Sequence, residues 1–255
     1  MRTITAQPAT TSAPASTARK TALVAGILYL VTFITSIPAL ALEHPLLKQA
    51  GFIVSTGSNS RLVLGGVLDL LNALAAVGTA VALYPLLRQR HAGLALGFVT
   101  SRLLEAATIV TSVAAILSLV TLHKGAGTTG AEKTAMVTTG KSLIALHDWT
   151  FLLGPGLLPG VNALLLGTIM YRSGLVPRII PTIGLIGAPM LLASATATIF
   201  GVYDQVSSPS ALAALPVAAW ELSVGMWMTF KGFKPAALTS LNSASAPTRG
   251  AVPVV

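Results

Sequence analysis

Six long apolar stretches, separated by short polar segments, dominate the pattern of the chain. They cover residues 21–42, 62–84, 92–122, 143–171, 179–202 and 211–230. Each is at least as long as the ~20 apolar residues that an α-helix needs to cross the hydrocarbon core of a bilayer. The pattern therefore predicts an all-α integral membrane protein, a six-helix bundle whose six-span transmembrane domain covers residues 19–232.

The two ends of the chain lack such stretches. Residues 1–18 are mostly Ala, Thr, Ser and Pro, with too few bulky apolar side chains to offset the entropy of ordering them. We expect a disordered N-terminal tail there and a disordered C-terminal tail over residues 233–255. The first apolar stretch ends in an Ala-Leu-Ala triplet that imitates a signal-peptidase site, but it exceeds the about 7–15 residues of a secretory signal. We expect a retained helix, with a cleaved signal as the alternative.

The fourth apolar stretch contains its own interruption. Residues 154–160 read Gly-Pro-Gly-Leu-Leu-Pro-Gly, which removes amide donors and interrupts the helical hydrogen bonds. The sequence predicts two half-helices around an irregular centre. Non-helical backbone inside a membrane is tolerated where it is buried in protein or lines a wet cavity. A simple packing kink is the alternative, since Pro and Gly are common in membrane helices.

Composition excludes several classes of soluble protein. Of the 255 residues 53% are apolar and only 9% are charged, whereas soluble domains have about 25% charged residues. Without cysteine the chain can form no disulfide, thiolate nucleophile or thiolate-metal site. The net charge of +9 comes from basic residues that stand singly in short loops, not from the clustered face that binds phosphates, so we expect no nucleic-acid partner.

The placement of the basic residues predicts the orientation of the bundle. One side of the membrane receives ten: Arg2, Arg19, Lys20, Arg88, Arg90, Arg172, Arg178, Lys231, Lys234 and Arg249. The other side receives five: Lys48, Arg61, Lys124, Lys133 and Lys141. Because short cytoplasmic loops carry the excess of Lys and Arg, we expect a multi-pass protein of the cell membrane with both termini cytoplasmic.

Polar side chains inside the apolar stretches are the candidates for function. A charged side chain at the centre of a membrane helix costs at least ~2.5–3.5 kcal/mol on insertion scales, so it usually faces the interior of the bundle. The candidate catalytic residues are Asp69, Glu105, Asp148 and Glu221, and the candidate substrate-binding residues are Asn72, Arg102, His147, Trp149 and Asn162. We expect them to line one polar cavity that opens to one side.

Structural roles are the alternatives for several of these residues. Arg102 and Glu105 lie three apart on one helix face, where they can form an ion pair that neutralises itself. Asp69 and Asn72 share a face in the same way and can link helices by hydrogen bonds. Glu221 lies at the middle of its stretch, so it must be paired, protonated or facing a cavity.

The histidines argue against a His-rich metal site. Only His147 lies inside an apolar stretch, while His44, His91 and His123 lie in loops or at stretch ends. We therefore expect no zinc or iron site and no cofactor, and an oxygen-rich site for a hard cation stays open. No glycine-rich loop has the spacing of a phosphate-binding motif.

Several short motifs resemble one known family. They are His147-Asp148-Trp149, Gly154-Pro155-Gly156, Asn162, Leu166-Gly167, the turn Tyr171-Arg172-Ser173-Gly174-Leu175-Val176-Pro177-Arg178, Gly184 and Gly187, with Arg19 before Ala25-Gly26 and the pair Arg102 and Glu105. Over about residues 18–232 the chain resembles the bacterial multi-pass membrane family called domain of unknown function 4386. The resemblance implies a six-helix integral membrane protein and carries no established activity.

Three functions are compatible with these features. The leading hypothesis is a small membrane enzyme that performs acid–base chemistry on a lipophilic substrate such as an isoprenoid or a lipid, in the manner of a cyclase. A carboxylic acid buried in apolar surroundings can hold a proton and donate it to such a substrate. The alternatives are a proton-coupled transporter or permease component and a non-catalytic interaction subunit. The expected partners are membrane lipids, a lipophilic small molecule and a second copy of the chain.

Overall fold

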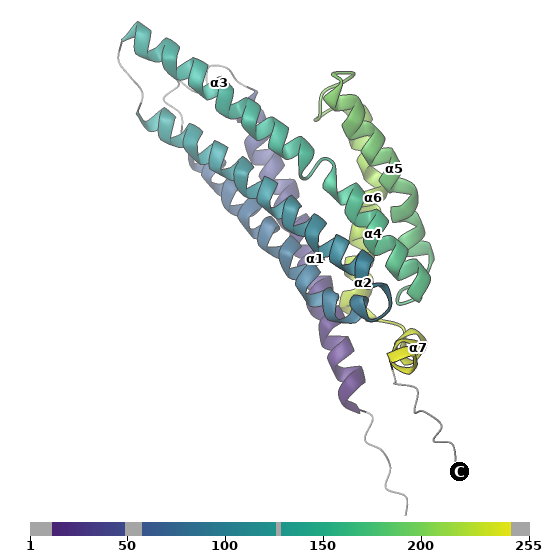
Figure 1. The fold of residues 1–255 in the computed structure, drawn as a ribbon. Coiled ribbons are helices and arrows are strands. Elements are labelled where there is room, and N and C mark those ends of the chain that lie inside the picture. The colour runs from purple at the N-terminus through teal and green to yellow at the C-terminus, as the bar shows by residue number, and fades with distance from the viewer. Residues whose placement is uncertain (1–11, 49–57, 126–128, 246–255) are drawn as a thin grey trace, which may run out of the picture.

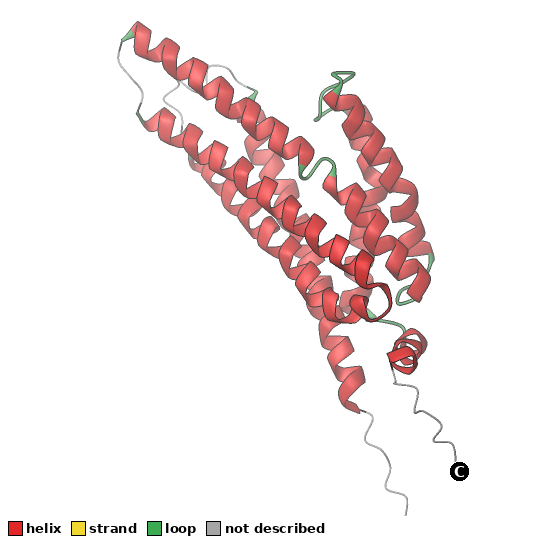
Figure 2. Cartoon of the chain, viewed as in Figure 1, coloured by secondary structure: helices red, strands yellow, loops and turns green. Residues whose placement is uncertain are grey.

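The computed structural model describes residues 12–48, 58–125 and 129–245, and within these residues the chain is helical, without strands (Figures 1 and 2). The helices are α1 (Ser12–Leu47), α2 (Ser60–Lys124), α3 (Gly130–Leu153), α4 (Leu158–Ser173), α5 (Ile179–Ile199), α6 (Ser208–Phe230) and α7 (Pro235–Ser245). Five helical segments, counting α3 and α4 together, are long and apolar enough to cross a membrane. The predicted all-α membrane fold is confirmed.

Helix α2 accounts for two of the six predicted crossings. Its backbone leaves the helical conformation at His91, where φ is −134° and ψ is 56°, and the chain turns back on itself (Figure 1). The two halves run antiparallel, because Leu62 shares a small core with Ile116 and Ala73 shares another with Ile109. With this turn, the bundle has the six predicted crossings.

Small residues allow the helices to approach closely. A methyl group on Gly26 of α1 would meet the backbone of Gly225 and Thr229 on α6, and one on Gly184 of α5 would enter the ring of Trp220. Close backbone approach of this kind is how helices pack in a membrane, where no hydrophobic force drives them together. Trp220 lies at the centre of the main core, 1% exposed.

Parts of the two predicted tails are helical. Helix α1 begins at Ser12, inside the predicted N-terminal tail of residues 1–18, and α7 lies inside the predicted C-terminal tail of residues 233–255. Helix α7 is held because Phe233 and Ala237 are buried in the main core. Residues 1–11 and 246–255 lie outside the described residues.

Helix α1 also reaches further at its other end than the sequence indicated. Glu43, His44 and Pro45 follow the first apolar stretch in the sequence, but α1 continues through them to Leu47. In Figure 1 the ends of α1, α2 and α3 form an extension on the same side of the molecule as the α5–α6 loop, and α3 reaches furthest. A separate small core, which includes Leu47, Leu62, Leu119 and Met136, holds this extension together.

Candidate functional site

The fourth crossing is broken, as the sequence predicts. Helix α3 ends at Leu153 and α4 begins at Leu158. The turn between them stays hydrogen-bonded, because the amide of Gly154 donates to Thr150 O at 2.9 Å and the amide of Gly156 donates to Phe151 O at 2.9 Å. The break thus ends α3 within two turns of His147 and Asp148.

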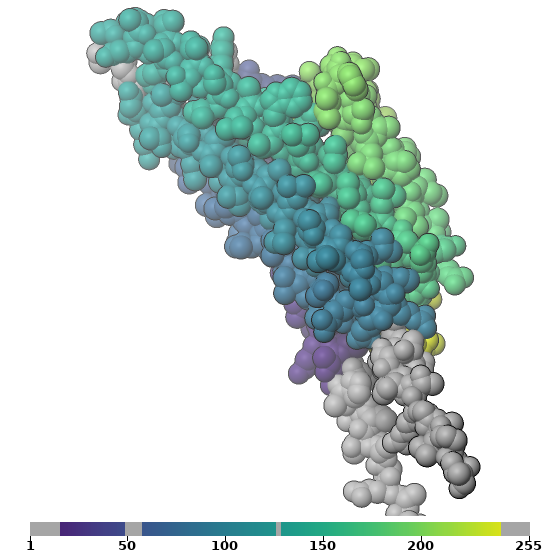
Figure 3. All heavy atoms as spheres, in the orientation of Figure 1, coloured from purple at the N-terminus to yellow at the C-terminus, as the bar shows by residue number. Residues whose placement is uncertain are grey.

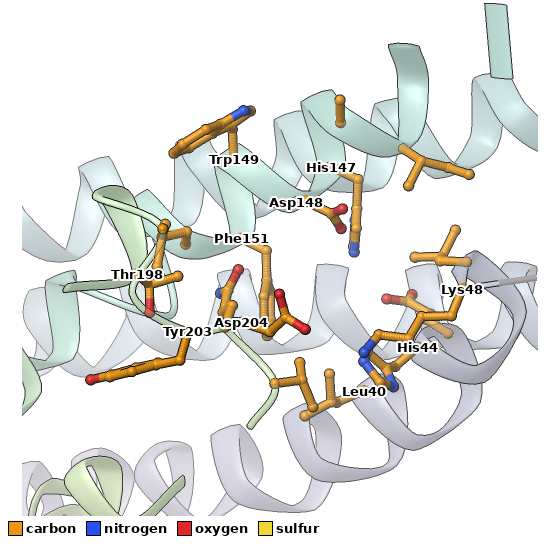
Figure 4. A pocket seen from close by; sticks show the side chains of 18 residues that line it. Leu40, His44, Lys48, His147, Asp148, Trp149, Phe151, Thr198, Tyr203 and Asp204 are labelled. Carbon is orange, nitrogen blue, oxygen red and sulfur yellow. The ribbon is translucent and has the colours of Figure 1, made fainter. Parts of the chain in front are cut away.

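A cavity of about 450 Å³ lies beside this last part of α3. Its other walls are the end of α1 and the loop between α5 and α6 (Figure 4). The space-filling view shows a notch between the teal upper part of α3 and the light-green end of α5 (Figure 3). The lining residues are Leu40, Glu43, His44, Leu47, Lys48, Ile144, Ala145, His147, Asp148, Trp149, Phe151, Leu152, Thr198, Gly201, Tyr203, Asp204, Gln205 and Val206.

Polar groups from three elements meet in this cavity. In Figure 4, the side chains of His147 and Asp148 of α3 point into the cavity. His44 and Lys48 of α1 and Asp204 of the α5–α6 loop line it from other sides. His44 and Lys48 are close enough to Asp148 to interact with it electrostatically. The cavity therefore combines acids, bases and an apolar wall.

His147 is held by a serine on the neighbouring helix. Its Nδ1 lies 2.6 Å from Oγ of Ser112 on α2, and its ring stacks on Phe151 with centroids 5.9 Å apart. His147 is 7% exposed and Ser112 is 2% exposed. Because Nδ1 is engaged by Ser112, Nε2 is the ring nitrogen that remains to meet a ligand in the cavity.

The α5–α6 loop is fastened to the helices on both sides of it. Tyr203 donates from its hydroxyl group to Oγ of Ser194 at 2.9 Å. With its amide oriented to satisfy both groups, Gln205 donates to Asp148 O at 3.3 Å and accepts from Leu152 N at 3.1 Å. The loop thus forms a defined wall of the cavity.

A second, smaller cavity of about 220 Å³ adjoins the helix break. Pro155 and Gly156 of the break line it, together with Ser194 of α5 and Ser210 of α6. Of the two interpretations of the Gly-Pro segment, the structure thus favours the one in which the irregular backbone lines a cavity.

Four other candidate residues form a separate buried network. Arg102 donates from Nη1 to Oε2 of Glu105 at 3.0 Å and from Nη2 to Oε1 of Glu221 at 2.9 Å. Asn162 of α4 donates from Nδ2 to the same Oε2 of Glu105 at 2.7 Å. The guanidinium also lies over the ring of Tyr29, 5.0 Å from its centroid. The expected Arg102–Glu105 ion pair and the need of Glu221 for a partner are confirmed.

The candidate residues thus lie in separate places in the structure. Of the nine candidates, only His147, Asp148 and Trp149 line the two cavities described. Asp69 and Asn72 are buried on α2, at 7% and 9% exposure, apart from those linings. Arg102 holds Glu105 and Glu221 in an ion network of their own, so the larger cavity accounts for three of the nine candidates, and the shared cavity expected for all nine stays a prediction.

Several cavity residues were missed by sequence reasoning. Glu43 and His44 directly follow the first apolar stretch, and Asp204 and Gln205 lie between the fifth and sixth stretches, so none of them was a candidate. Ser112 looks like any other small residue in an apolar stretch. The signal that could have found Glu43 is its spacing of four residues from both Ala39 and Leu47, which puts it on the same helix face as these buried positions.

Within the described ranges, no three His, Asp or Glu side chains are grouped closely enough to hold a metal ion. Zinc and calcium sites need at least that many convergent ligands. The polar groups of the cavity are instead arranged around a space of ligand size.

The fold and the cavity define a class of protein: a multi-pass helical membrane protein with a polar cavity at one end of its bundle. The chain belongs to the family described as Domain of unknown function (DUF4386), whose model matches residues 24–232. This confirms the resemblance carried by its motifs. No curated protein and no solved structure matches the chain.

Proposed function

We propose that this protein is a membrane enzyme that performs acid–base chemistry on a lipophilic substrate held in the larger cavity. The observation that carries the proposal is the pairing of an oriented histidine, His147, with the neighbouring Asp148 in a cavity of about 450 Å³. That volume is within the about 300–1,000 Å³ typical of ligand sites.

His147 and Asp148 are the residues to which we assign proton transfer. Ser112 fixes the histidine through Nδ1, so Nε2 can accept a proton from a bound substrate or donate one to it. Asp148 supplies a carboxyl group at the same wall. Glu105 and Glu221 are assigned a structural role instead, because both are engaged by Arg102.

The apolar wall sets the class of substrate. Leu40, Leu47, Ile144, Phe151 and Leu152 line the cavity between the polar groups. A molecule with a hydrocarbon part and one polar or reactive end, such as an isoprenoid or a lipid, matches this division. By the positive-inside rule, the termini are cytoplasmic and the cavity lies on the outer side of the cell membrane.

The test is a mass-spectrometric comparison of lipid extracts from hosts that express the protein or its variants at equal membrane abundance. The His147→Gln and Asp148→Asn variants remove the two assigned groups. Glu132→Gln is the matched control, because Glu132 is exposed at the start of α3 and glutamine keeps its capping position. We expect a product with the unchanged chain and the control only. Identical extracts from all hosts, supplied with prenyl diphosphates and common lipids, would overturn the proposal.

A proton-coupled transporter is the second candidate, and the helix break favours it. Transporters often bind their substrates where interrupted helices line a cavity, and Pro155 and Gly156 do so here. Uptake into proteoliposomes that depends on a pH gradient and leaves the substrate chemically unchanged would support this function and exclude the enzyme.

A further inference from the structure

The charges that line the larger cavity are unbalanced. Glu43, Asp148 and Asp204 contribute three carboxyl groups, and Lys48 is the one lysine or arginine among the lining residues. Lys48 is exposed, and no ion pair holds it to these acids within the described residues. The cavity thus offers more negative than positive charge to whatever enters it.

Glu43 is the most informative of the three acids. Its side chain lines the cavity, yet the residue is only 3% exposed. Its Oε1 has no hydrogen-bond partner in the part of the chain that the structure describes, and its side chain packs on Gly65 of α2. A buried acceptor without a partner costs free energy, and a positive charge held in the cavity beside this carboxyl group would offset that cost electrostatically.

The rest of the lining fits an organic cation better than a metal ion. Trp149, Phe151 and Tyr203 stand among the lining residues together with leucine side chains. Aromatic faces attract ammonium groups, and carboxylates complete the recognition of such ligands. A bare metal ion would gain nothing from these apolar groups, and the described residues hold no cluster of ligands for one.

We propose that the ligand of this cavity is a lipophilic cation, an amphiphile with an ammonium-like group. The cation lies beside Glu43 and Asp148, and the hydrocarbon part lies along Leu40, Leu47 and Phe151. This inference rests on the proposed function insofar as the cavity is taken to be the substrate site, and it narrows the substrate to molecules with a positively charged end.

A matched pair of probes tests the sign of the charge. Tetraphenylphosphonium and tetraphenylborate have nearly the same shape and opposite charges. Their binding is measured by equilibrium dialysis against the full chain in phosphatidylcholine nanodiscs, with empty nanodiscs subtracted for partition into lipid. We expect saturable binding of the phosphonium and none of the borate. Saturable binding of the borate, or of neither probe, would overturn the inference.

Variants locate the binding in the cavity. Glu43→Gln and Asp148→Asn should each weaken phosphonium binding about tenfold, which corresponds to about 1.4 kcal/mol. Lys48→Gln should strengthen it, because the competing positive charge is removed. Glu132→Gln removes one exposed carboxylate on the same side of the molecule and should change nothing. Equal weakening by Glu132→Gln, or no effect of Lys48→Gln and Glu43→Gln, would contradict the assignment.

The experiments distinguish failure of the enzyme proposal from failure of the cation-site proposal. Phosphonium binding without a new lipid product would uphold the cation site and exclude the enzyme. A new product that depends on His147 and Asp148, together with no preference for the phosphonium, would uphold the enzyme and exclude the cationic substrate.

Discussion

At the scale of single residues, Arg102 determines how the bundle interior tolerates its charges. Its guanidinium faces two carboxyl groups, from Glu105 on its own helix and Glu221 on α6. Side chains of Arg102 and Glu105 are only 3% and 7% exposed. Since charges buried without partners are strongly destabilising, the arginine is what allows both acids to lie inside the membrane domain.

Replacing Arg102 by methionine should therefore destabilise the protein strongly. The substitution keeps an apolar stem of similar length but leaves two buried acids without their cation, at a cost of about 3–5 kcal/mol. Unfolding by sodium dodecyl sulfate, followed by circular dichroism of the purified protein, measures the change. Arg61→Met, at an exposed position on α2, is the control and should change little. Equal stability of the two variants would show that the network contributes nothing.

Ser112 holds the imidazole ring of His147 in the orientation that proton transfer requires. Changing Ser112 to alanine removes the hydroxyl group that holds Nδ1, and the freed ring can rotate away from its position. We expect product formation in the lipid-extract assay to fall about tenfold, less than the about 10²–10⁴-fold that a whole acid–base group contributes, because the imidazole itself stays. Ser112→Thr keeps the hydroxyl and should restore most of the product. Full activity of the alanine variant would remove Ser112 from the mechanism.

The sequence predicts pairings within one helix much better than pairings between helices. Arg102 and Glu105 could be paired from their spacing alone. Glu221 could be said to need a partner, but its partner lies 119 positions away, and nothing local encodes that contact. Ser112 carries no local signal either, because its role appears only when α3 brings His147 against it.

At the scale of helices, the break between α3 and α4 shapes the site. Pro155 and Pro159 lack amide hydrogens, so the helix cannot continue unbroken through them. The presence of the break can therefore be predicted from the sequence. Which side the break faces is decided by packing: Gly154 lies against Thr108 of α2, and Gly156 lies against the backbone of Leu152 and the side chain of Gln205. Those tertiary contacts explain why the cavity could not be located from the sequence.

Gly156 should be intolerant of a side chain. A Cβ atom there would lie 2.6 Å from Leu152 O and 3.2 Å from the side-chain amide of Gln205, so the backbone of the last turn of α3 would have to move. We expect Gly156→Ala to destabilise the protein by about 1–3 kcal/mol, as overpacking does. The same detergent-unfolding measurement applies.

Gly93 is the matched control for this change. An added Cβ atom meets nothing within 4 Å at this position, so Gly93→Ala should leave stability unchanged or raise it by up to about 1 kcal/mol. If both glycine variants lose the same stability, the close contact at Gly156 is not what makes the residue necessary.

At the scale of the whole molecule, the different lengths of the helices indicate where the cavity lies relative to the membrane. Helix α5 has 21 residues, or ~32 Å at 1.5 Å per residue, which just spans the ~30 Å hydrocarbon core. Helix α2 has 65 residues, so each half is about 30 residues or ~45 Å long. The excess length accounts for the extension that the ends of α1, α2 and α3 form (Figure 1). Because α5 spans the core with little to spare, we expect the cavity, which the α5–α6 loop borders, to lie at the membrane boundary.

This arrangement predicts which parts of the surface can be labelled from outside the cell. Because the chain has no cysteine, single introduced cysteines report their own positions without background. Thr134 is exposed on the extension, and Ala92 is exposed at the turn of α2 on the opposite side. A membrane-impermeant maleimide should label Thr134→Cys in intact cells and Ala92→Cys only after lysis, since both termini are expected on the side of Ala92. The unchanged chain should stay unlabelled throughout. The reverse pattern would place the cavity on the cytoplasmic side, where a lipophilic substrate would have to enter from the inner leaflet.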